Sequence, residues 1–397
     1  MRSSARSSGG EAIGQTRTPG RLLGGMKIYS LDWFLCHKLD YVEAAALLDV
    51  QGIDLVIAQN RYLPMADTAV KSEVTTEEQE RFQIYDDRLF VNALRSRGLQ
   101  YFAACNLFFD PLTLNRYPDA RAVDAAGRTA EAVDWYIATC PTHEGYFGEK
   151  LRQLQTAVRE LHPDGVFLAF TRFPGFWELW LPNTRRGDWP EYCFCSRCIR
   201  LFTEAKHLAL PKRFAERHAE WIYANAYTDY VAWKGDVVAD RVRVIRQSLT
   251  AIHPPVKIML NTVPFGVNDF GGAGREVFAQ DWQKLREVVD VFEVMAYHQI
   301  LGRDVPWITQ IAREVKQAVQ KPVLVTVQAK PLYLDGMHAR RGRKETLPYE
   351  EFVQALDAVR SAGADGFVVF TWSDFLHRGL VDKDLRYIEE IRLVTRG

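Results

Sequence analysis

The chain has 397 residues, of which 47% are hydrophobic and 25% charged, as in a globular protein with one large domain or two smaller ones. Its 50 basic residues balance 50 acidic ones, so it offers little attraction to a nucleic acid or an anionic membrane, and neither is expected as a partner. No apolar run approaches the roughly 20 residues of a membrane helix and no signal-peptide core is present, which predicts a cytoplasmic location.

Residues 1–25 are rich in Arg, Ser and Gly and lack apolar periodicity, which predicts a disordered N-terminal tail or extension. From residue 26 to residue 397, short apolar runs alternate with segments of helical period, as in βα units around a parallel sheet. The predicted strands are 27–34, 54–59, 100–107, 165–170, 257–263, 289–297, 323–328 and 366–372. Eight strands close a barrel, so the sequence predicts one (β/α)8 TIM barrel over residues 26–397.

Helices are predicted between the strands, at 41–48, 79–97, 145–161, 210–251, 307–319 and 349–361. Two intervals are longer than a βα connection requires, residues 110–142 after the third strand and 171–213 after the fourth. Because the active site of such a barrel is built from its βα loops, we expect substrate selectivity in these two extended loops.

Polar and aromatic residues at the ends of the predicted strands should converge on one pocket. The expected substrate-binding residues are Trp33, Asn60, Asn106, Arg172, Asn261, Tyr297, His298, Gln328 and Trp372. Amide, guanidinium and aromatic groups suit a neutral, hydroxyl-rich ligand such as a sugar. Tyr297 and His298 would supply a phenol and an imidazole at the pocket floor, although such a histidine is equally a structural hydrogen bonder.

Four carboxylates are candidates for catalysis, because glycoside hydrolysis generally uses a pair of carboxyl groups. They are Asp32, Glu178, Glu293 and Asp374. Each also has a structural interpretation: Asp32 as a loop anchor, Asp374 as a helix cap, and Glu178 as a rim residue of the aromatic segment FPGFWELW. Glu293 lies inside an apolar strand, where a carboxylate is either a site residue or a buried ion-pair partner.

Three cysteines, Cys193, Cys195 and Cys198, follow the fourth predicted strand at C-x-C-x2-C spacing. Thiols this close can share one tetrahedral ion, so the sequence predicts a zinc site. An all-thiolate zinc is closed and structural, because no coordination position remains for water. No Gly-rich phosphate loop, nucleophile elbow or HExxH motif is found, which gives little support to nucleotide-dependent enzymes, serine hydrolases or zinc peptidases.

Residues 139–202 resemble the barrel glycosidases that include the β-galactosidases of glycoside hydrolase family 42. That family places a Cys-Pro before the helix that leads to the fourth strand and a C-x-C-x2-C run after the strand, and the four cysteines hold zinc. Cys140-Pro141 and the cysteine triplet occupy the matching places here. The resemblance therefore implies Cys140 as the fourth zinc ligand, in preference to Cys36 and Cys105.

The chain is also similar to the glycosyl-hydrolase-like barrels of bacterial genomes and, more distantly, to the family 18 chitinases. The shared features are DGVFLAFTRFP at 164–174, MAYH at 295–298 and a tryptophan that ends the eighth strand. Where those relatives carry strand-four acids, this chain has Phe167, Ala169 and Thr171, and Gln328 replaces the glutamate nucleophile of the galactosidases. The resemblance thus implies the fold, the metal site and a sugar-sized pocket, but neither family's mechanism.

The leading hypothesis is a glycoside hydrolase or related carbohydrate-active enzyme, with Glu293 and Asp374 as the preferred catalytic pair. The second is a non-catalytic carbohydrate-binding barrel, which gains weight from Ala169 and Gln328. The third is a metal-dependent hydrolase of another class, which would need a metal with an open position at His298. No organic cofactor is expected, and the sugar and the oligomeric state stay unspecified at this point.

Overall fold

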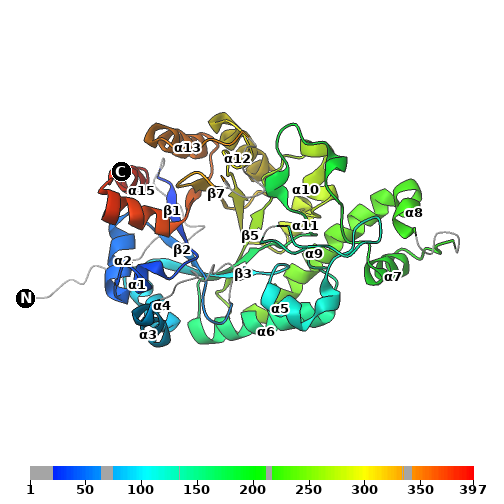
Figure 1. The fold of residues 1–397 in the computed structure, drawn as a ribbon, viewed down its shortest axis with the longest axis horizontal. Coiled ribbons are helices and arrows are strands. Elements are labelled where there is room, and N and C mark those ends of the chain that lie inside the picture. Colours follow the sequence, from blue (N-terminus) through cyan, green and yellow to red (C-terminus); the bar gives the residue numbers. More distant parts are fainter. Residues whose placement is uncertain (1–20, 64–74, 134, 212–216, 333, 335–341) are drawn as a thin grey trace, which may run out of the picture.

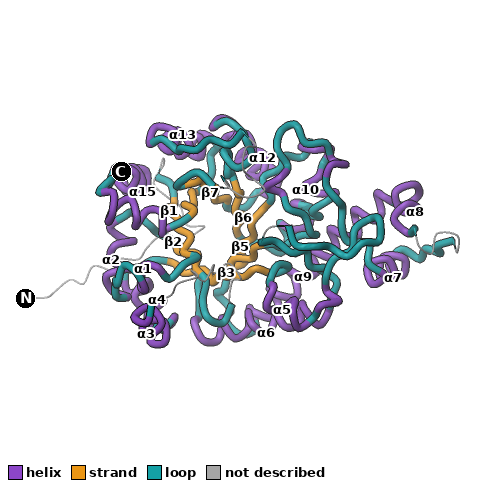
Figure 2. Tube along the Cα trace, in the orientation of Figure 1, coloured by secondary structure: helices purple, strands orange, loops and turns teal. Residues whose placement is uncertain are grey.

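The computed structural model describes residues 21–63, 75–133, 135–211, 217–332, 334 and 342–397. Eight parallel strands close into a barrel in chain order, with β1 paired to both β2 and β8. The strands are β1 (Leu23–Ile28), β2 (Leu55–Ala58), β3 (Gln100–Asn106), β4 (Gly165–Ala169), β5 (Lys257–Thr262), β6 (Val291–Met295), β7 (Val323–Gln328) and β8 (Gly366–Phe370). Figure 2 shows them as a ring surrounded by helices, which confirms the predicted (β/α)8 barrel.

The helices lie mainly between successive strands. They are α1 (Asp32–Leu35), α2 (Tyr41–Val50), α3 (Thr76–Ile84), α4 (Asp87–Ser96), α5 (Pro111–Arg116), α6 (Glu144–Leu161), α7 (Ser196–Ala205), α8 (His218–Asn225), α9 (Tyr227–Thr250), α10 (Ala273–Glu276), α11 (Trp282–Leu285), α12 (Val305–Val319), α13 (Tyr349–Ser361), α14 (Trp372–Leu376) and α15 (Arg386–Arg396). The predicted helix 79–97 forms two helices, α3 and α4, and the predicted helix 210–251 contains α8 and α9. Among the described helices, none combines the length and the apolar character needed to span a membrane.

The first strand lies earlier in the chain than predicted. β1 includes residues 23–25 of the predicted tail, and Gly25 pairs with Leu55 of β2 and with Val368 of β8. Asp32, expected at the end of this strand, already belongs to α1. The barrel therefore begins before the predicted boundary at Met26, and residues 1–20 lie outside the described residues.

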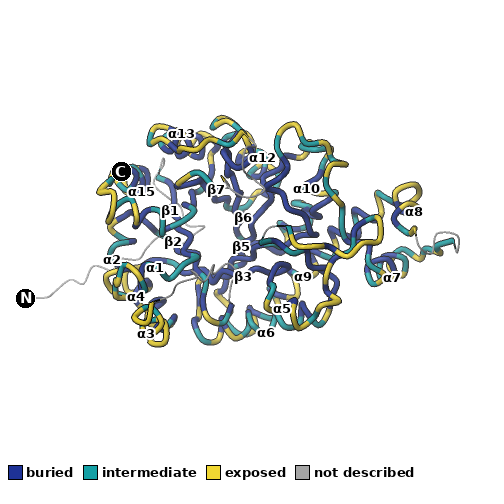
Figure 3. Tube along the Cα trace, in the orientation of Figure 1, coloured by how far each residue is buried: buried dark blue, intermediate teal, exposed yellow. Residues whose placement is uncertain are grey.

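Strand alternation divides the apolar side chains between the inside and the outside of the barrel. The inner cluster includes Phe102, Phe167 and Leu324, whereas the outer cluster packs the strands against the helices. Gly165 is required beside Phe102, because a Cβ atom there would lie 2.2 Å from the phenyl ring. In Figure 3 the strands are buried and the exposed residues are found on the surrounding helices and loops.

The two extended loops are present where the sequence predicts them. The connection from β3 to α6 contains α5, and the connection from β4 to α9 contains the short 3₁₀ helix η2 (Trp177–Leu179) followed by α7 and α8. Figure 1 shows α7 and α8 at the opposite end of the molecule from α15. These loops carry Glu178 and all four cysteines of the predicted metal site.

Candidate functional site at the barrel opening

A buried ion pair joins the first and sixth strands inside the barrel. Lys27 Nζ lies 3.0 Å from Glu293 Oε1 and 3.3 Å from the Tyr297 hydroxyl oxygen, and both charged side chains are almost fully buried. Burial lowers the pKa of Lys27 and raises the pKa of Glu293, and the opposite charge of the partner counteracts each shift. Tyr29, just after β1, and Met295, the last residue of β6, are the next residues in the same alternation, so the pair lies below the barrel opening.

Aromatic rings surround that opening. Tyr29 and Phe170 are half-buried and pack against the inner cluster. Phe370, also half-buried, has its ring centroid 5.8 Å from that of Tyr29 and 5.4 Å from that of Tyr297. Trp177 from the loop after β4 stacks on Tyr297 with centroids 5.9 Å apart and ring planes at 20°. We call Tyr29, Phe170 and Phe370 the aromatic rim.

Glu178 is a buried carboxyl group, only 4% exposed, in η2 next to Trp177, the residue that stacks on Tyr297. Burial raises the pKa of Glu178 to about 7, although the positive charges of Arg172 and Arg343 act in the opposite direction. Its Oε2 atom has no hydrogen-bond partner among the described residues. A carboxyl group that keeps its proton near neutral pH and has an unpaired oxygen is equipped to donate that proton.

Asp32 and Asp374 come from adjacent segments that follow β1 and β8. Asp32 is half-buried, and its Oδ1 atom accepts hydrogen bonds from the Trp33 N–H group (2.9 Å) and the Ser373 hydroxyl (3.0 Å). Asp374 accepts from the backbone N–H and the hydroxyl of Thr371, both at 3.2 Å, in the capping box of α14. It also pairs with Lys330 at 2.6 Å, so its oxygens are already engaged by helix capping and an ion pair.

Trp33 and Trp372 do not line the opening, contrary to expectation. Both are completely or almost completely buried, and the Trp33 ring packs against Tyr85, Phe90 and Trp372. The indole N–H of Trp372 donates to Gln51 Oε1 at 3.0 Å. The strands end before both tryptophans, so the rings belong to helices α1 and α14 and fill the outer core.

Two of the expected binding amides are used to hold loops. Asn60 Oδ1 accepts from the backbone N–H groups of residues 62 and 63, both at 3.1 Å, because Asn60 lies out of phase with the inward residues of β2. Gln328 Oε1 accepts from the N–H groups of residues 299 and 300, and its Nε2 donates to the carbonyl oxygen of Lys330 at 3.1 Å. Neither amide oxygen is left for a ligand.

His298 and Tyr297 point to different sides of β6. His298 Nε2 lies 2.8 Å from Glu351 Oε1 on α13, whereas the Tyr297 hydroxyl reaches Lys27 inside the barrel. Burial lowers the pKa of His298, and hydrogen bonding to Glu351 acts in the opposite direction. The expected phenol and imidazole are thus separated. Within the described part of the chain, no group of three or more potential metal ligands includes His298.

The remaining expected residues lie on the inner side or at the opening. Alternation from Phe102 and from Met259 of the inner cluster directs Asn106 and Asn261 inward at the ends of β3 and β5. Arg172 is buried, with its guanidinium 4.9 Å from the Phe170 ring centroid, and it donates to the carbonyl oxygen of Gly175 at 3.2 Å. These three side chains and Tyr297 are the expected binding residues that the fold brings toward the opening.

The four predicted metal ligands come together in space. The sulfur atoms of Cys140, Cys193, Cys195 and Cys198 all lie within 4.8 Å of one another. Two of the distances are 3.4 Å (Cys140 to Cys198) and 3.8 Å (Cys140 to Cys195). Four thiolates around one ion at about 2.3 Å would be separated by about 3.8 Å, so the arrangement of the cluster is close to that of a four-thiolate metal site.

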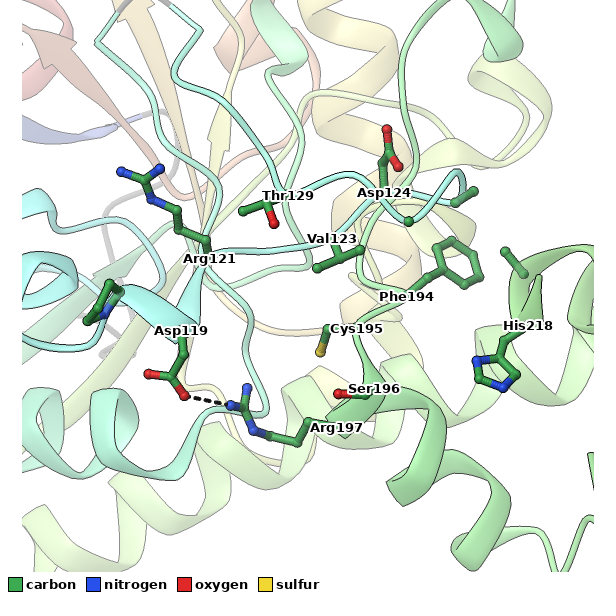
Figure 4. Close-up of a pocket in the computed structure, with 14 residues that line it drawn as sticks. Asp119, Arg121, Val123, Asp124, Thr129, Phe194, Cys195, Ser196, Arg197 and His218 are labelled. Carbon is green, nitrogen blue, oxygen red and sulfur yellow. Dashed lines mark hydrogen bonds and ion pairs between the residues drawn. The ribbon is translucent and has the colours of Figure 1, made fainter. Parts of the chain in front are cut away.

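A cavity of about 520 Å³ lies beside this cysteine cluster, away from the barrel opening. Figure 4 shows Cys195 among its lining residues, next to Ser196 at the start of α7, with an ion pair between Asp119 and Arg197 at one side. Cys195 is the half-buried member of the cluster, and the other three cysteines are buried. The cavity therefore gives solvent access to one sulfur of the cluster.

Sequence reasoning did not identify Lys27 or the aromatic rim. Lys27 is the single cation in an otherwise apolar strand, a pattern that indicates a buried partner of opposite charge. Glu293 is the matching acid in β6, so the pair could have been anticipated. Tyr29 and Phe170 directly follow β1 and β4, and Phe370 is the last residue of β8, so the rim can be found only once the strand ends are fixed.

Comparisons with known proteins support the fold. No protein-family model matches the chain, and no curated protein sequence matches it. A family 42 β-galactosidase from G. stearothermophilus is similar in structure, with a TM-score of 0.62 and 13% identity over 95% of this chain and 56% of that one. The β-galactosidase from Marinomonas ef1 gives a TM-score of 0.59 and 13% identity over 88% and 54% of the two chains. This chain spans about half the length of these β-galactosidases.

A third similar structure is the glycoside hydrolase domain of PgaB from Bordetella bronchiseptica. Its TM-score is 0.61 with 14% identity, and the likeness covers 92% of this chain and 98% of that domain. Identities this low show the fold alone. The chain therefore has a closed, glycoside-hydrolase-like (β/α)8 barrel.

Proposed function

We propose that the protein is a glycoside hydrolase that uses Glu178 as its general acid. The observation that carries the proposal is the buried Glu178 carboxyl group, whose pKa is raised to about 7 and whose Oε2 atom is unpaired. Glycoside hydrolysis needs one carboxylic acid that stays protonated at the working pH and protonates the leaving oxygen. The similar structures include a glycoside hydrolase domain and a β-galactosidase, which supports this class of reaction.

Asp32 is the proposed second carboxylate, acting as base or nucleophile. It is half-buried at the start of α1, and it accepts hydrogen bonds from two neutral donors without a cationic partner among the described residues. Glu293 and Asp374, the pair preferred from the sequence, are less suitable. Glu293 is paired with Lys27 below the rim, and Asp374 is engaged by Thr371 and Lys330.

A panel of nitrophenyl glycosides identifies the sugar that the protein hydrolyses, and the methyl glycoside of that sugar provides the direct test, because its leaving group needs a proton. On the methyl glycoside, Glu178→Gln is expected to lower kcat at least about a hundredfold, the scale of a lost acid–base group. Asp32→Asn should lower kcat by a similar factor, whereas Asp374→Asn should mainly reduce stability. Full activity of Glu178→Gln would remove the assignment, and a loss of kcat only in Asp374→Asn would restore the pair preferred from the sequence.

A non-catalytic carbohydrate-binding barrel is the second candidate function. The specific observation in its favour is that Gln328, at the place of the galactosidase nucleophile, has its amide occupied by backbone hydrogen bonds. Ala169 likewise offers no acid on β4. Sugar binding with no turnover of any nitrophenyl glycoside would favour this candidate over the hydrolase.

We further propose that the cysteine cluster holds a structural zinc ion. Thiolate sulfur is the ligand that tetrahedral structural zinc prefers, and the observed spacing suits a closed site with four protein ligands. When bound, zinc would cross-link the loop before α6 to the start of α7. Elemental analysis of the purified protein should find about one zinc per chain, and a metal-free native protein would contradict this.

A further inference from the structure

Inward-facing residues of four neighbouring strands form one row near the top of the barrel. Asn106 of β3 pairs in register with Ala169 of β4, and Asn261 of β5 pairs with Glu293 of β6. Leu168 pairs with Leu260, so the β4 and β5 residues of the row are also neighbours. We call Asn106, Ala169, Asn261 and Glu293 the inner row.

Three oxygen atoms of this inner row have no hydrogen-bond partner among the described residues. They are Oδ1 of Asn106, Oδ1 of Asn261 and Oε2 of Glu293, and the three side chains are buried. A buried polar atom without a partner destabilises the folded state, so native proteins nearly always provide one from protein, water or ligand. All three atoms are acceptors, and the missing partner is therefore a donor.

The charges of the row indicate what kind of donor fits. Lys27 neutralises Glu293 at 3.0 Å, the two amides are neutral, and the small Ala169 between them adds neither charge nor bulk. The row thus has no net charge that would select a cation. Neutral hydroxyl groups are the donors that match two amide oxygens, and the aromatic rim above offers rings for the apolar face of a sugar.

We propose that Asn106 and Asn261 are specificity-determining residues that accept hydrogen bonds from two hydroxyl groups of a neutral sugar seated over Ala169. The proposal rests on the carbohydrate function proposed above and defines the ligand chemistry of that site. Asn261 is oriented for this role, because its Nδ2 atom donates to Met295 Sδ at 3.3 Å and its Oδ1 atom has no partner among the described residues.

Gln328 provides a matched control at the end of β7. Its amide is buried like those of Asn106 and Asn261, but its oxygen and nitrogen are both bonded to the backbone. Replacing an internally bonded amide by an apolar side chain leaves buried backbone groups without partners, whereas replacing an open amide removes an unpaired acceptor. The two kinds of variant should therefore differ in the sign of their effect on stability.

The test compares Asn106→Leu, Asn261→Leu and Gln328→Met in the full chain. Thermal unfolding measures stability, and isothermal titration with galactose, glucose, xylose and glucosamine measures affinity. We expect unchanged or higher melting temperatures for the two Asn→Leu variants and a lower one for Gln328→Met. Each Asn→Leu variant should bind its best neutral sugar at least about tenfold more weakly, and glucosamine should bind the wild-type protein more weakly than glucose does.

Several results would overturn the inference. One is a melting temperature that falls in the Asn→Leu variants as much as in Gln328→Met, which would mean that internal water satisfies the amides. Others are unchanged affinity in both Asn→Leu variants, or no binding of any neutral probe. Failure of the hydrolase proposal gives a different result. Sugar binding that depends on Asn106 and Asn261, with no turnover of any glycoside, would contradict the proposed hydrolase activity and leave this inference standing.

Discussion

At the scale of single residues, strand phase decides which side chains meet inside the barrel. Lys27 and Glu293 lie in phase on two strands and form a buried ion pair, whereas Asn60 lies out of phase and caps a turn. A shift of one residue in the predicted alternation assigns a strand side chain to the wrong face of the sheet. An error of a few residues in the predicted end of the first strand likewise placed Trp33 at the opening, whereas its ring lies in the outer core. The sequence therefore identified the candidate carboxylates but not which of them reach the opening.

The Lys27–Glu293 pair leads to a stability prediction. Lys27→Met should lower the free energy of unfolding by about 3–5 kcal/mol, because Glu293 is left as an uncompensated buried charge. The double variant Lys27→Met/Glu293→Gln should recover much of this loss, since no charge remains in the interior. Urea unfolding of the single and double variants measures both values. The interpretation would be contradicted if the double variant lost as much free energy of unfolding as Lys27→Met and Glu293→Gln lose together.

Glu178 should make stability depend on pH. Its pKa rises from the ordinary 4.5 to about 7 in the folded protein, so between these values the folded state binds more protons than the unfolded state. The free energy of unfolding should consequently fall as the pH rises from about 5 to about 7, by up to about 3 kcal/mol.

The matched variant for this prediction is Glu178→Gln, which keeps the shape but cannot titrate. Urea unfolding at several pH values should show that the wild-type protein loses stability relative to Glu178→Gln as the pH rises. Parallel pH profiles of the two proteins would show that Glu178 ionises normally, and the general-acid role would then lose its basis.

At the scale of elements, the cysteine cluster brings the two extended loops together. It connects Cys140, just before α6, to Cys195 and Cys198 at the start of α7, across a loop that also carries Glu178. The metal-ligand spacing within the triplet could be recognised in the sequence, because three of the ligands are local. The fourth ligand is distant in the chain, and only the family resemblance indicated it before the fold was known.

Cys195→Ser should therefore release the metal and lower the melting temperature. The cavity beside Cys195 also predicts that a zinc chelator removes metal from the folded wild-type protein. Cys36→Ser is the control, because Cys36 is exposed and far from the cluster in sequence, and it should keep both metal content and melting temperature. Unchanged metal content in Cys195→Ser would contradict the four-cysteine site.

At the scale of the whole molecule, the alternation of short apolar runs and helical segments was sufficient to predict the barrel. Each strand needs only a local apolar run, and closure follows from the number of βα units. The site depends instead on loop conformation, such as the stack of Trp177 on Tyr297 that places η2 over the opening. Loop conformation has no periodic pattern in the sequence, which is why Glu178 could be proposed as the general acid only once the fold was known.

The central claim is that Glu178 protonates the leaving group of a glycoside. The most direct measurement compares wild-type and Glu178→Gln kcat/KM on dinitrophenyl glycosides, whose leaving group needs no proton, and on methyl glycosides of the same sugar, whose leaving group does. We predict that Glu178→Gln keeps most of the activity on the dinitrophenyl glycoside and loses at least about a hundredfold on the methyl glycoside. An equal loss on both substrates would contradict the claim.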